Sequence, residues 1–345
     1  MNTDWQDYLA RRGAIFDSEI LRHFGNETSE LLATAQATTL CTLSQFGTLR
    51  LSGEDAQSFL QNMLSNDIAE VGATRAQLSS LNSPKGRMLA SMMICRDGAD
   101  YLLQLPKALC EPIRKKLGMY VLRAKVKISD ASDEIISLGL SSTAASEILG
   151  GLFGGLPQQF LGCASSEQAS VLRFDDARFQ INTTAQHAPA LWQTLSQHAQ
   201  PVGSPCWDWL NIRSGIPFIL PQTQEQFVAQ MVNFDLVGGI NFKKGCYPGQ
   251  EIVARMQYLG KLKRRMYLAH VGSDDAPQAG DELFSADMEG QASGMVVNAA
   301  PAPGGGFDLL AVIQISSRET QLVHLDSLQG RALQYLSLPY PLSQT

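Results

Sequence analysis

The order of strands and helices between residues 130 and 200 limits the fold of this chain more than any other feature. Hydrophobic periodicity predicts a strand over 135–140, a helix over 143–149, a glycine-rich loop over 150–155, strands over 171–174 and 178–183, and a helix from Pro189. This β-α-β-β-α order is the split pattern of α+β proteins, and it excludes a doubly wound parallel sheet, in which strands and helices alternate strictly. We therefore predict an α+β fold.

Both flanks of this region carry their own patterns. Upstream we predict a helix over 4–12, a hairpin over 39–51 that turns at Gln45-Phe46-Gly47, a helix from 52–55, a strand over 101–105, a helix from Pro106 to about Gly118 and a basic strand over 121–128. From Arg264 onward, short strands (266–271, 282–285, 292–298, 308–315 and 331–336) alternate with turns, and no helix signal remains. That tail is typical of a small β-barrel or sandwich.

The length of 345 residues favours several domains or subdomains. From the shifts in pattern we expect a leading helix or extension over 1–35 and a first α+β subdomain over 36–130. A second α+β subdomain over 131–263 and a C-terminal β-barrel over 264–345 complete the expected division.

Composition and charge exclude several classes of protein. Charged residues make up 17% and apolar residues 44% of the chain, which argues against intrinsic disorder. The 27 basic and 33 acidic residues give a net charge of −6, so no global positive field attracts a polyanion, and direct tRNA binding is not expected. No run of 18 apolar residues predicts a membrane helix.

The six cysteines are scattered and form no C-x-x-C motif, and the histidines form no H-E-x-x-H motif, so we predict no metal site from local spacing. Walker A, G-x-S-x-G and G-x-G-x-x-G motifs are also absent from the sequence. The first residues lack a basic region followed by an apolar run, so we expect no secretory signal, reduced thiols and a cytoplasmic location.

The segment from Gly238 to Glu251 is the most unusual in the chain. It contains Gly238, Gly239, Gly245, Pro248 and Gly249, which no regular helix or central strand accommodates. The residues that follow, 251–256, are helix-compatible, so Cys246 is expected just before a helix N-terminus and beside Lys243 and Lys244. Both the helix dipole and the ammonium groups favour a thiolate, and this predicts a reactive thiol. The alternative is an inert cysteine buried in a tight loop.

Two other stretches leave alternatives open. The basic cluster Lys261, Lys263, Arg264 and Arg265 is suited to an anionic tail or a nucleic-acid backbone, or it is a solvated loop. Trp207 and Trp209 share a face on a strand but diverge on a helix. Either tryptophan could stack a flat heteroaromatic ring or pack in a core.

The segment Lys244-Gly245-Cys246-Tyr247-Pro248-Gly249-Gln250-Glu251 resembles the K-G-C-[FY]-x-G-Q-E signature of the YgfZ-type folate-binding proteins. These proteins are relatives of the glycine-cleavage T-protein, an aminomethyltransferase. Further matches in family order are Gly53-Glu54-Asp55-Ala56, Lys85-Gly86-Arg87 and the segment from Trp207 to Pro217, and Arg255 follows the signature. The resemblance extends from about Leu40 to Tyr340.

The resemblance implies a T-protein-like, multi-part α+β fold with a C-terminal β-barrel and a cavity that binds tetrahydrofolate. It also implies a role in assembly or repair of iron–sulfur clusters in client enzymes, including enzymes that thiolate tRNA. The family's key cysteine falls on Cys246. Its folate-contacting tryptophans fall on Trp207 and on Phe46, where phenylalanine keeps a stacking face but lacks the indole N–H. Asn233 is expected to contact the pterin edge, and Ala229 stands where the family often has proline.

A folate-dependent aminomethyl or one-carbon transferase is the alternative function. That chemistry needs an acid near the folate amine, and the turn region that would carry one reads Leu81-Asn82-Ser83-Pro84. The sequence therefore leaves open whether a reaction is catalysed, which client proteins depend on the chain, and its oligomeric state.

Overall fold

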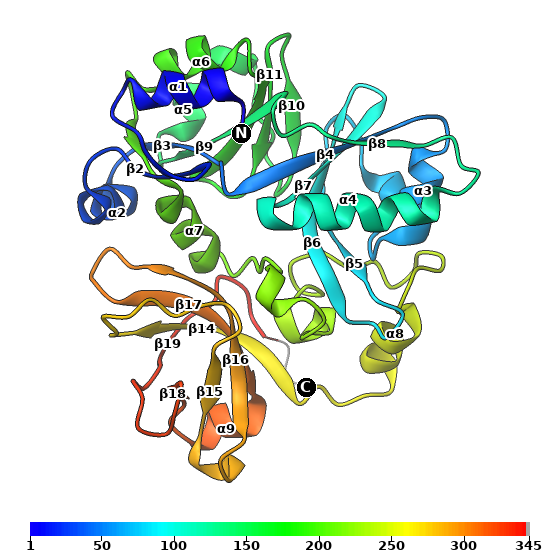
Figure 1. Ribbon diagram of the computed structural model, residues 1–345, viewed down its shortest axis with the longest axis vertical. Coiled ribbons are helices and arrows are strands. Elements are labelled where there is room, and N and C mark those ends of the chain that lie inside the picture. The colour runs from blue at the N-terminus through cyan, green and yellow to red at the C-terminus, as the bar shows by residue number, and fades with distance from the viewer. Residues whose placement is uncertain (343–345) are drawn as a thin grey trace. The chain divides into compact units, whose positions relative to one another are not determined.

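The chain forms two compact units, each assembled from segments that are far apart in the sequence. A computed structural model describes residues 1–342 (Figure 1). Unit 1 contains Met1–Phe59, Ile68–Gln77 and Met93–Trp207; unit 2 contains Leu60–Asp67, Leu78–Met92 and the chain from Asp208. The expected division was instead into four consecutive segments, and that division stays a prediction.

Unit 1 contains a mixed six-stranded sheet in the order β10-β11-β12-β9-β3-β13. Its neighbouring strands are antiparallel except for β13, which runs parallel to β3. The strands are β3 (Thr39–Thr42), β9 (Ile135–Ser141), β10 (Cys163–Ser165), β11 (Ala169–Arg173), β12 (Arg178–Thr184) and β13 (Gln200–Val202). With α5 (Ala145–Phe153) and α6 (Ala188–Leu195), they confirm the predicted split α+β order. The predicted loop over 150–155 is wrong in part, because α5 continues through Phe153 and ends at Gly154 in a left-handed conformation.

The leading residues belong to the core of unit 1. They form α1 (Thr3–Ala10), β1 (Ile15–Asp17), β2 (Ile20–His23) and α2 (Glu27–Gln36). Trp5 of α1 is buried with Leu9 in one core cluster, where it meets Trp192 edge to face at 5.6 Å. Its indole Nε1 also donates to the Thr42 hydroxyl at 3.1 Å, so α1 is fixed by both packing and a buried hydrogen bond.

A second sheet has the order β5-β6-β7-β4-β8. Its strands are β4 (Phe46–Ser52), β5 (Gln77–Asn82), β6 (Met88–Asp97), β7 (Asp100–Pro106) and β8 (Lys127–Asp130), and α4 (Lys107–Val121) lies against it. The predicted hairpin over 39–51 is wrong: β3 pairs with β9 and β13, whereas β4 pairs with β7 and β8. The basic stretch over 121–128 is also mostly not a strand, because α4 extends to Val121 and β8 begins only at Lys127.

Unit 2 is built around one antiparallel sheet in the order β18-β15-β16-β17-β14-β19. Its strands are β14 (Arg264–Val271), β15 (Glu282–Phe284), β16 (Ala292–Pro301), β17 (Phe307–Gln314), β18 (His324–Leu325) and β19 (Gln334–Leu336). The predicted C-terminal strands are therefore present. One short helix, α9 (Ile315–Thr320), is present where the sequence predicted none.

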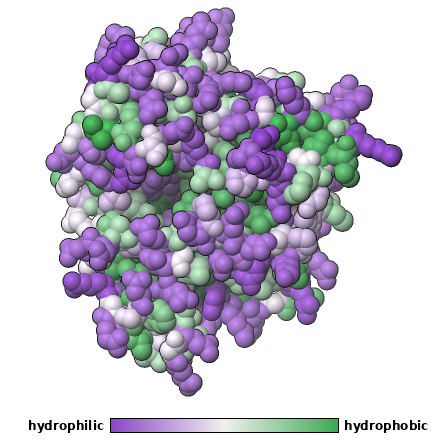
Figure 2. All heavy atoms as spheres, in the orientation of Figure 1, coloured by the Kyte–Doolittle hydropathy of each residue, from purple (hydrophilic) through white to green (hydrophobic). Residues whose placement is uncertain are grey.

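The remaining elements connect these sheets. They are α3 (Ala56–Met63), α7 (Ser204–Arg213), α8 (Gln250–Tyr258) and the 3-10 helices η1 (Ile68–Glu70), η2 (Pro221–Thr223), η3 (Ala229–Val232) and η4 (Ala286–Met288). Hydrophilic residues cover most of the face drawn in Figure 2, with hydrophobic ones scattered among them. Within residues 1–342, no helix is long and apolar enough to cross a membrane.

Candidate functional site

The Cys246 loop, residues 238–249, carries the only exposed thiol among the cysteines, all six of which lie within the described residues. None of the six forms a disulfide; Cys163 is half-buried and the other four are buried. Cys246 lies four residues before the first residue of α8. The sequence predicted a helix N-terminus just after this cysteine. Accessibility is the first requirement of a reactive cysteine, and Cys246 meets it.

Lys244 and Tyr247, on either side of the thiol, are both buried and anchor the loop. The Lys244 ammonium donates to the backbone carbonyls of Gln61 and Leu64, at the C-terminal end of α3. Such carbonyls have no partner within their own helix, so a cation there is favoured. Burial lowers the pKa of Lys244 to about 8. The sequence placed this charge beside the thiol, whereas the structure directs it to the end of α3.

Tyr247 packs beneath the same ammonium. The Lys244 Nζ atom lies 5.1 Å from the centre of its ring, within the range of a cation–π contact. Burial raises the pKa of Tyr247 to about 12, so the phenol stays neutral. The loop therefore places two side chains inward and leaves the one between them, Cys246, facing outward to water.

Hydrogen bonds from Ser65 and Asn66 hold the start of the loop. The Ser65 hydroxyl donates to the Gly239 carbonyl at 2.7 Å, and Asn66 Nδ2 donates to the Gly238 carbonyl at 2.8 Å. At the other end, Gln250 Nε2 donates to the Lys244 carbonyl at 3.2 Å. Nothing in the sequence pairs residues 64–66 with a loop 170 residues later, so this support could not be predicted.

Gly249 begins α8 and touches the turn over 83–86. Its φ of +80° suits glycine, and a Cβ here would lie 2.5 Å from both the Ser83 carbonyl oxygen and the Gly86 Cα. The turn and the loop therefore pack backbone to backbone. Of the remaining residues of the motif, Glu251 and Arg255 are exposed on α8.

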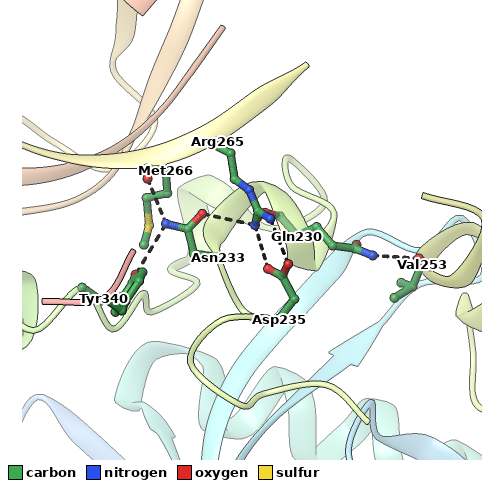
Figure 3. Close-up of polar contacts among 8 residues, drawn as sticks. Gln230, Asn233, Asp235, Val253, Arg265, Met266 and Tyr340 are labelled. Carbon is green, nitrogen blue, oxygen red and sulfur yellow. Dashed lines mark hydrogen bonds and ion pairs between the residues drawn. The ribbon is translucent and has the colours of Figure 1, made fainter. Parts of the chain in front are cut away.

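Asn233 lies in a buried polar network that reaches α8 (Figure 3). Its side chain donates to the Met266 carbonyl at 2.9 Å and accepts from Arg265 at 3.4 Å. Arg265 in turn makes a two-pronged ion pair with Asp235, at 2.7 and 3.0 Å, and Gln230 Nε2 donates to the Val253 carbonyl of α8 at 2.7 Å. The polar edge expected to face a pterin thus has protein partners already.

Trp207 and Phe46 belong to unit 1, whereas the Cys246 loop and Asn233 belong to unit 2. Trp207 lies on α7, is 2% exposed, and packs so closely on Gly139 that a Cβ there would lie 2.5 Å from its ring. Phe174 meets it edge to face at 6.1 Å. Of the two sequence alternatives, the helix with a core-packed ring is the one the structure contains.

Phe46, the first residue of β4, is half-buried. It lines a cavity of about 20 Å³ together with Trp5, Lys107 and their neighbours in unit 1. That volume holds about one water molecule. Within residues 1–342, no group of three or more His, Cys, Asp or Glu side chains could hold a metal ion.

The fold and the loop define a class of protein. Residues 16–206 match the family model of the GCVT N-terminal domain. The crystal structure of the glycine cleavage system aminomethyltransferase T from Bartonella henselae has the same fold, with a TM-score of 0.81 and 18% identity over 98% of this chain and 97% of that one.

Relatives over most of the chain narrow the class further. The tRNA-modifying protein YgfZ of Enterobacter sp. (strain 638) is 30% identical over 308 residues, which is 89% of this chain and 94% of that protein. YgfZ of Shigella boydii serotype 4 (strain Sb227) is 29% identical over the same shares. The chain belongs to the YgfZ family of GCVT-domain proteins, which confirms the resemblance of its signature segment and the predicted T-protein-like α+β fold.

Proposed function

We propose that this protein is a tetrahydrofolate-binding accessory factor that supports iron–sulfur cluster assembly or repair in client enzymes, and through them tRNA modification such as thiolation. The observation that carries the proposal is an exposed thiol on a loop whose neighbouring residues, Lys244 and Tyr247, are buried and fixed. Such a thiol reaches a partner's metal or sulfur atom without reorganising its own backbone. The relatives' name, tRNA-modifying protein, supports the proposed link to tRNA modification.

Tetrahydrofolate needs an aromatic contact for its pterin ring and polar atoms for the ring edge. Asn82 Nδ2 and Ser83 Oγ are buried and have no hydrogen-bond partner within residues 1–342, and they lie at the turn that touches Gly249. Buried polar atoms of this kind are stabilised by a ligand that bonds to them, so they fit a pterin edge. The family resemblance assigns the ring contacts to Trp207 and Phe46 and a contact with the pterin edge to Asn233.

A fluorescence titration tests the folate part of the proposal. We expect tetrahydrofolate to quench the intrinsic fluorescence of the protein in a saturable way, because the family resemblance assigns a folate contact to Trp207. The Trp207→Phe variant should lose most of the quench, whereas the matched Trp209→Phe variant should keep it. Absence of any quench up to millimolar folate would contradict the proposal.

A folate-dependent aminomethyl transferase is the second candidate, favoured by the fold shared with an aminomethyltransferase. The turn that would carry the catalytic acid presents Asn82 and Ser83, which supply no carboxylate to protonate or stabilise a folate amine. Incubation with tetrahydrofolate and an aminomethylated carrier protein decides between the two: methylene transfer to the folate would favour the transferase.

We place this activity in the cytoplasm. None of the six cysteines forms a disulfide, which suits a reducing compartment. The partners in this proposal are folate and iron–sulfur client enzymes, and the iron–sulfur cluster is cargo of the client rather than a resident group of this chain.

A further inference from the structure

The helix α8 and its two flanking segments carry a concentration of positive charge. We define the α8 surface as Lys243, Arg255, Lys261, Lys263, Arg264 and the ring of Tyr258, all in unit 2. Lys243 lies in the Cys246 loop, Arg255 and Tyr258 lie on α8, and the last three cations follow that helix. The sole acidic residue of α8 and its flanks over 241–264 is Glu251.

Within residues 1–342, the charged side-chain group of each of these five residues has no hydrogen-bond or ion-pair partner. The contrast with neighbouring cations is direct: Lys244 is bound to two backbone carbonyls, and Arg265 to Asp235. Lys244 and Arg265 therefore stabilise the fold, whereas the five cations of the α8 surface are available to a partner. The backbone under Lys263 and Arg264 is fixed, because Ile315 N donates to the Lys263 carbonyl at 2.9 Å and Arg264 pairs with Gln314 in the sheet.

Tyr258 supplies an aromatic ring on the same helix as Arg255, three residues further along the chain. Its side chain is 67% exposed, and Phe242 meets its ring edge to face, with centroids 6.4 Å apart. The contact also brings the backbone of Lys243, next to Phe242, to the C-terminal end of α8. An exposed ring held on one edge keeps a face available to a second planar group.

We propose that the α8 surface binds a single-stranded segment of RNA, with the cations on the phosphates and a base stacked on Tyr258. Proteins bind single-stranded nucleic acid with cations that contact the phosphates and with aromatic rings that stack on the bases. The α8 surface contains both kinds of side chain. The inference deepens the proposed function and rests on its link to tRNA, adding direct contact with the RNA to the contact through client enzymes.

An acidic protein face is the competing partner, and two observations argue against it. Three of the five cations are lysines, which are depleted from protein–protein interfaces, where arginine and aromatic residues are enriched. Lysine is by contrast a common phosphate contact in nucleic-acid binding. Tyr258 also lies three residues from both Arg255 and Lys261 in the sequence, whereas the centre of a protein interface is depleted of charged residues.

Fluorescence anisotropy with a labelled single-stranded RNA and with a tRNA transcript tests the proposal. We expect both to bind, with affinity that falls steeply as salt rises. Lys261→Gln/Lys263→Gln should reduce the slope of log K against log salt by about 1.4, at about 0.7 per phosphate contact on a single strand. The control Arg123→Gln/Lys127→Gln, which removes two exposed cations of unit 1 that are equally unpaired within residues 1–342, should leave slope and affinity unchanged.

Substitution of the ring separates stacking from charge. Tyr258→Ala should weaken binding about 5- to 150-fold with an unchanged salt slope, and Tyr258→Phe should restore it. Absence of RNA binding at low salt, or equal losses in the unit 1 control, would overturn the inference. So would equal binding of polyglutamate that ignores Tyr258, which would indicate an acidic protein partner. Folate titration of the same variants reports separately on the proposed function.

Discussion

Cys246 differs from the other cysteines in its access to water and in the chemistry that follows from it. Burial raises the pKa of Cys95 and Cys110 to about 12 and that of Cys163 to about 11, so these three remain thiols at physiological pH. Cys246 faces solvent instead. At the scale of single residues, the chain therefore presents one thiol for chemistry and protects the others.

Alkylation of the native protein tests this difference. With limiting iodoacetamide at pH 7.5, mass spectrometry should find Cys246 modified first and Cys95 and Cys110 unmodified until the protein unfolds. The Cys246→Ser variant should unfold within about 0.5–1 kcal/mol of wild type, because the thiol packs against little. A larger loss of stability, or earlier alkylation of a buried cysteine, would indicate a structural role for Cys246.

The lowered pKa of Lys244 makes the free energy of unfolding depend on pH. This pKa is about 8 in the folded protein against 10.5 for an ordinary lysine, so between these values the unfolded chain binds more protons than the folded one. The contribution of Lys244 to the free energy of unfolding therefore increases as pH rises from about 8 to 10.5. Urea unfolding of wild type and Lys244→Met at pH 7.5 and pH 10 should show a difference that grows in favour of wild type. If the difference in unfolding free energy between the two proteins is the same at both pH values, burial does not lower the pKa of Lys244.

The start of α8 depends on backbone contact with the turn over 83–86. Gly249→Ala places a methyl group 2.5 Å from the Gly86 Cα and forces a left-handed conformation on alanine, at a cost of about 1–3 kcal/mol. Gly245→Ala, in the same loop, meets nothing within 4 Å and should change stability little. Denaturant unfolding of both variants measures this, and equal stabilities would show that the loop tolerates displacement from the turn.

The buried pair of Arg265 and Asp235 joins β14 to the chain after η3. Only 7% and 9% of the two side chains is exposed, so Asp235→Ala leaves a guanidinium without its counter-charge and should cost about 3–5 kcal/mol. Arg265→Met/Asp235→Leu should recover much of that loss, since no charge then stays buried. Glu111→Ala, which breaks an exposed pair with Arg114, should have little effect. Thermal unfolding that ranks Asp235→Ala with Glu111→Ala would contradict this account.

Elements were predictable from the sequence where periodicity is local, as in α1, α8, β12 and the strands after Arg264. The hairpin over 39–51 was wrong because two strands joined by a short connection entered different sheets, and pairing partners such as Gly139 and Gln104 lie far along the chain. In the candidate site, the sequence predicted the signature segment and the position of Cys246 just before a helix. The hydrogen-bond partners of Lys244 lie 180 and 183 residues away along the chain, and two of those of Asn233 lie 32 and 33 residues away. Periodicity does not encode contacts of this kind.

For the whole molecule, the net charge and the local distribution of charge are separate properties. The value of −6 argues against a global attraction for RNA, whereas the five cations and the ring of the α8 surface lie within 22 residues of each other in the sequence. Acidic residues elsewhere set the total, while screening over about 8–10 Å lets a local cluster act on its own.

Under the proposed function, the level of thiolated nucleosides in cellular tRNA is the most direct measure of what the Cys246 thiol does. In cells that lack this protein, they should be restored by wild type and by the control Cys206→Ser, if that buried variant accumulates normally, and not by Cys246→Ser at equal protein level. Quantitative mass spectrometry of digested tRNA measures the outcome. Full restoration by Cys246→Ser would contradict the claim that the exposed sulfur atom is what the protein contributes.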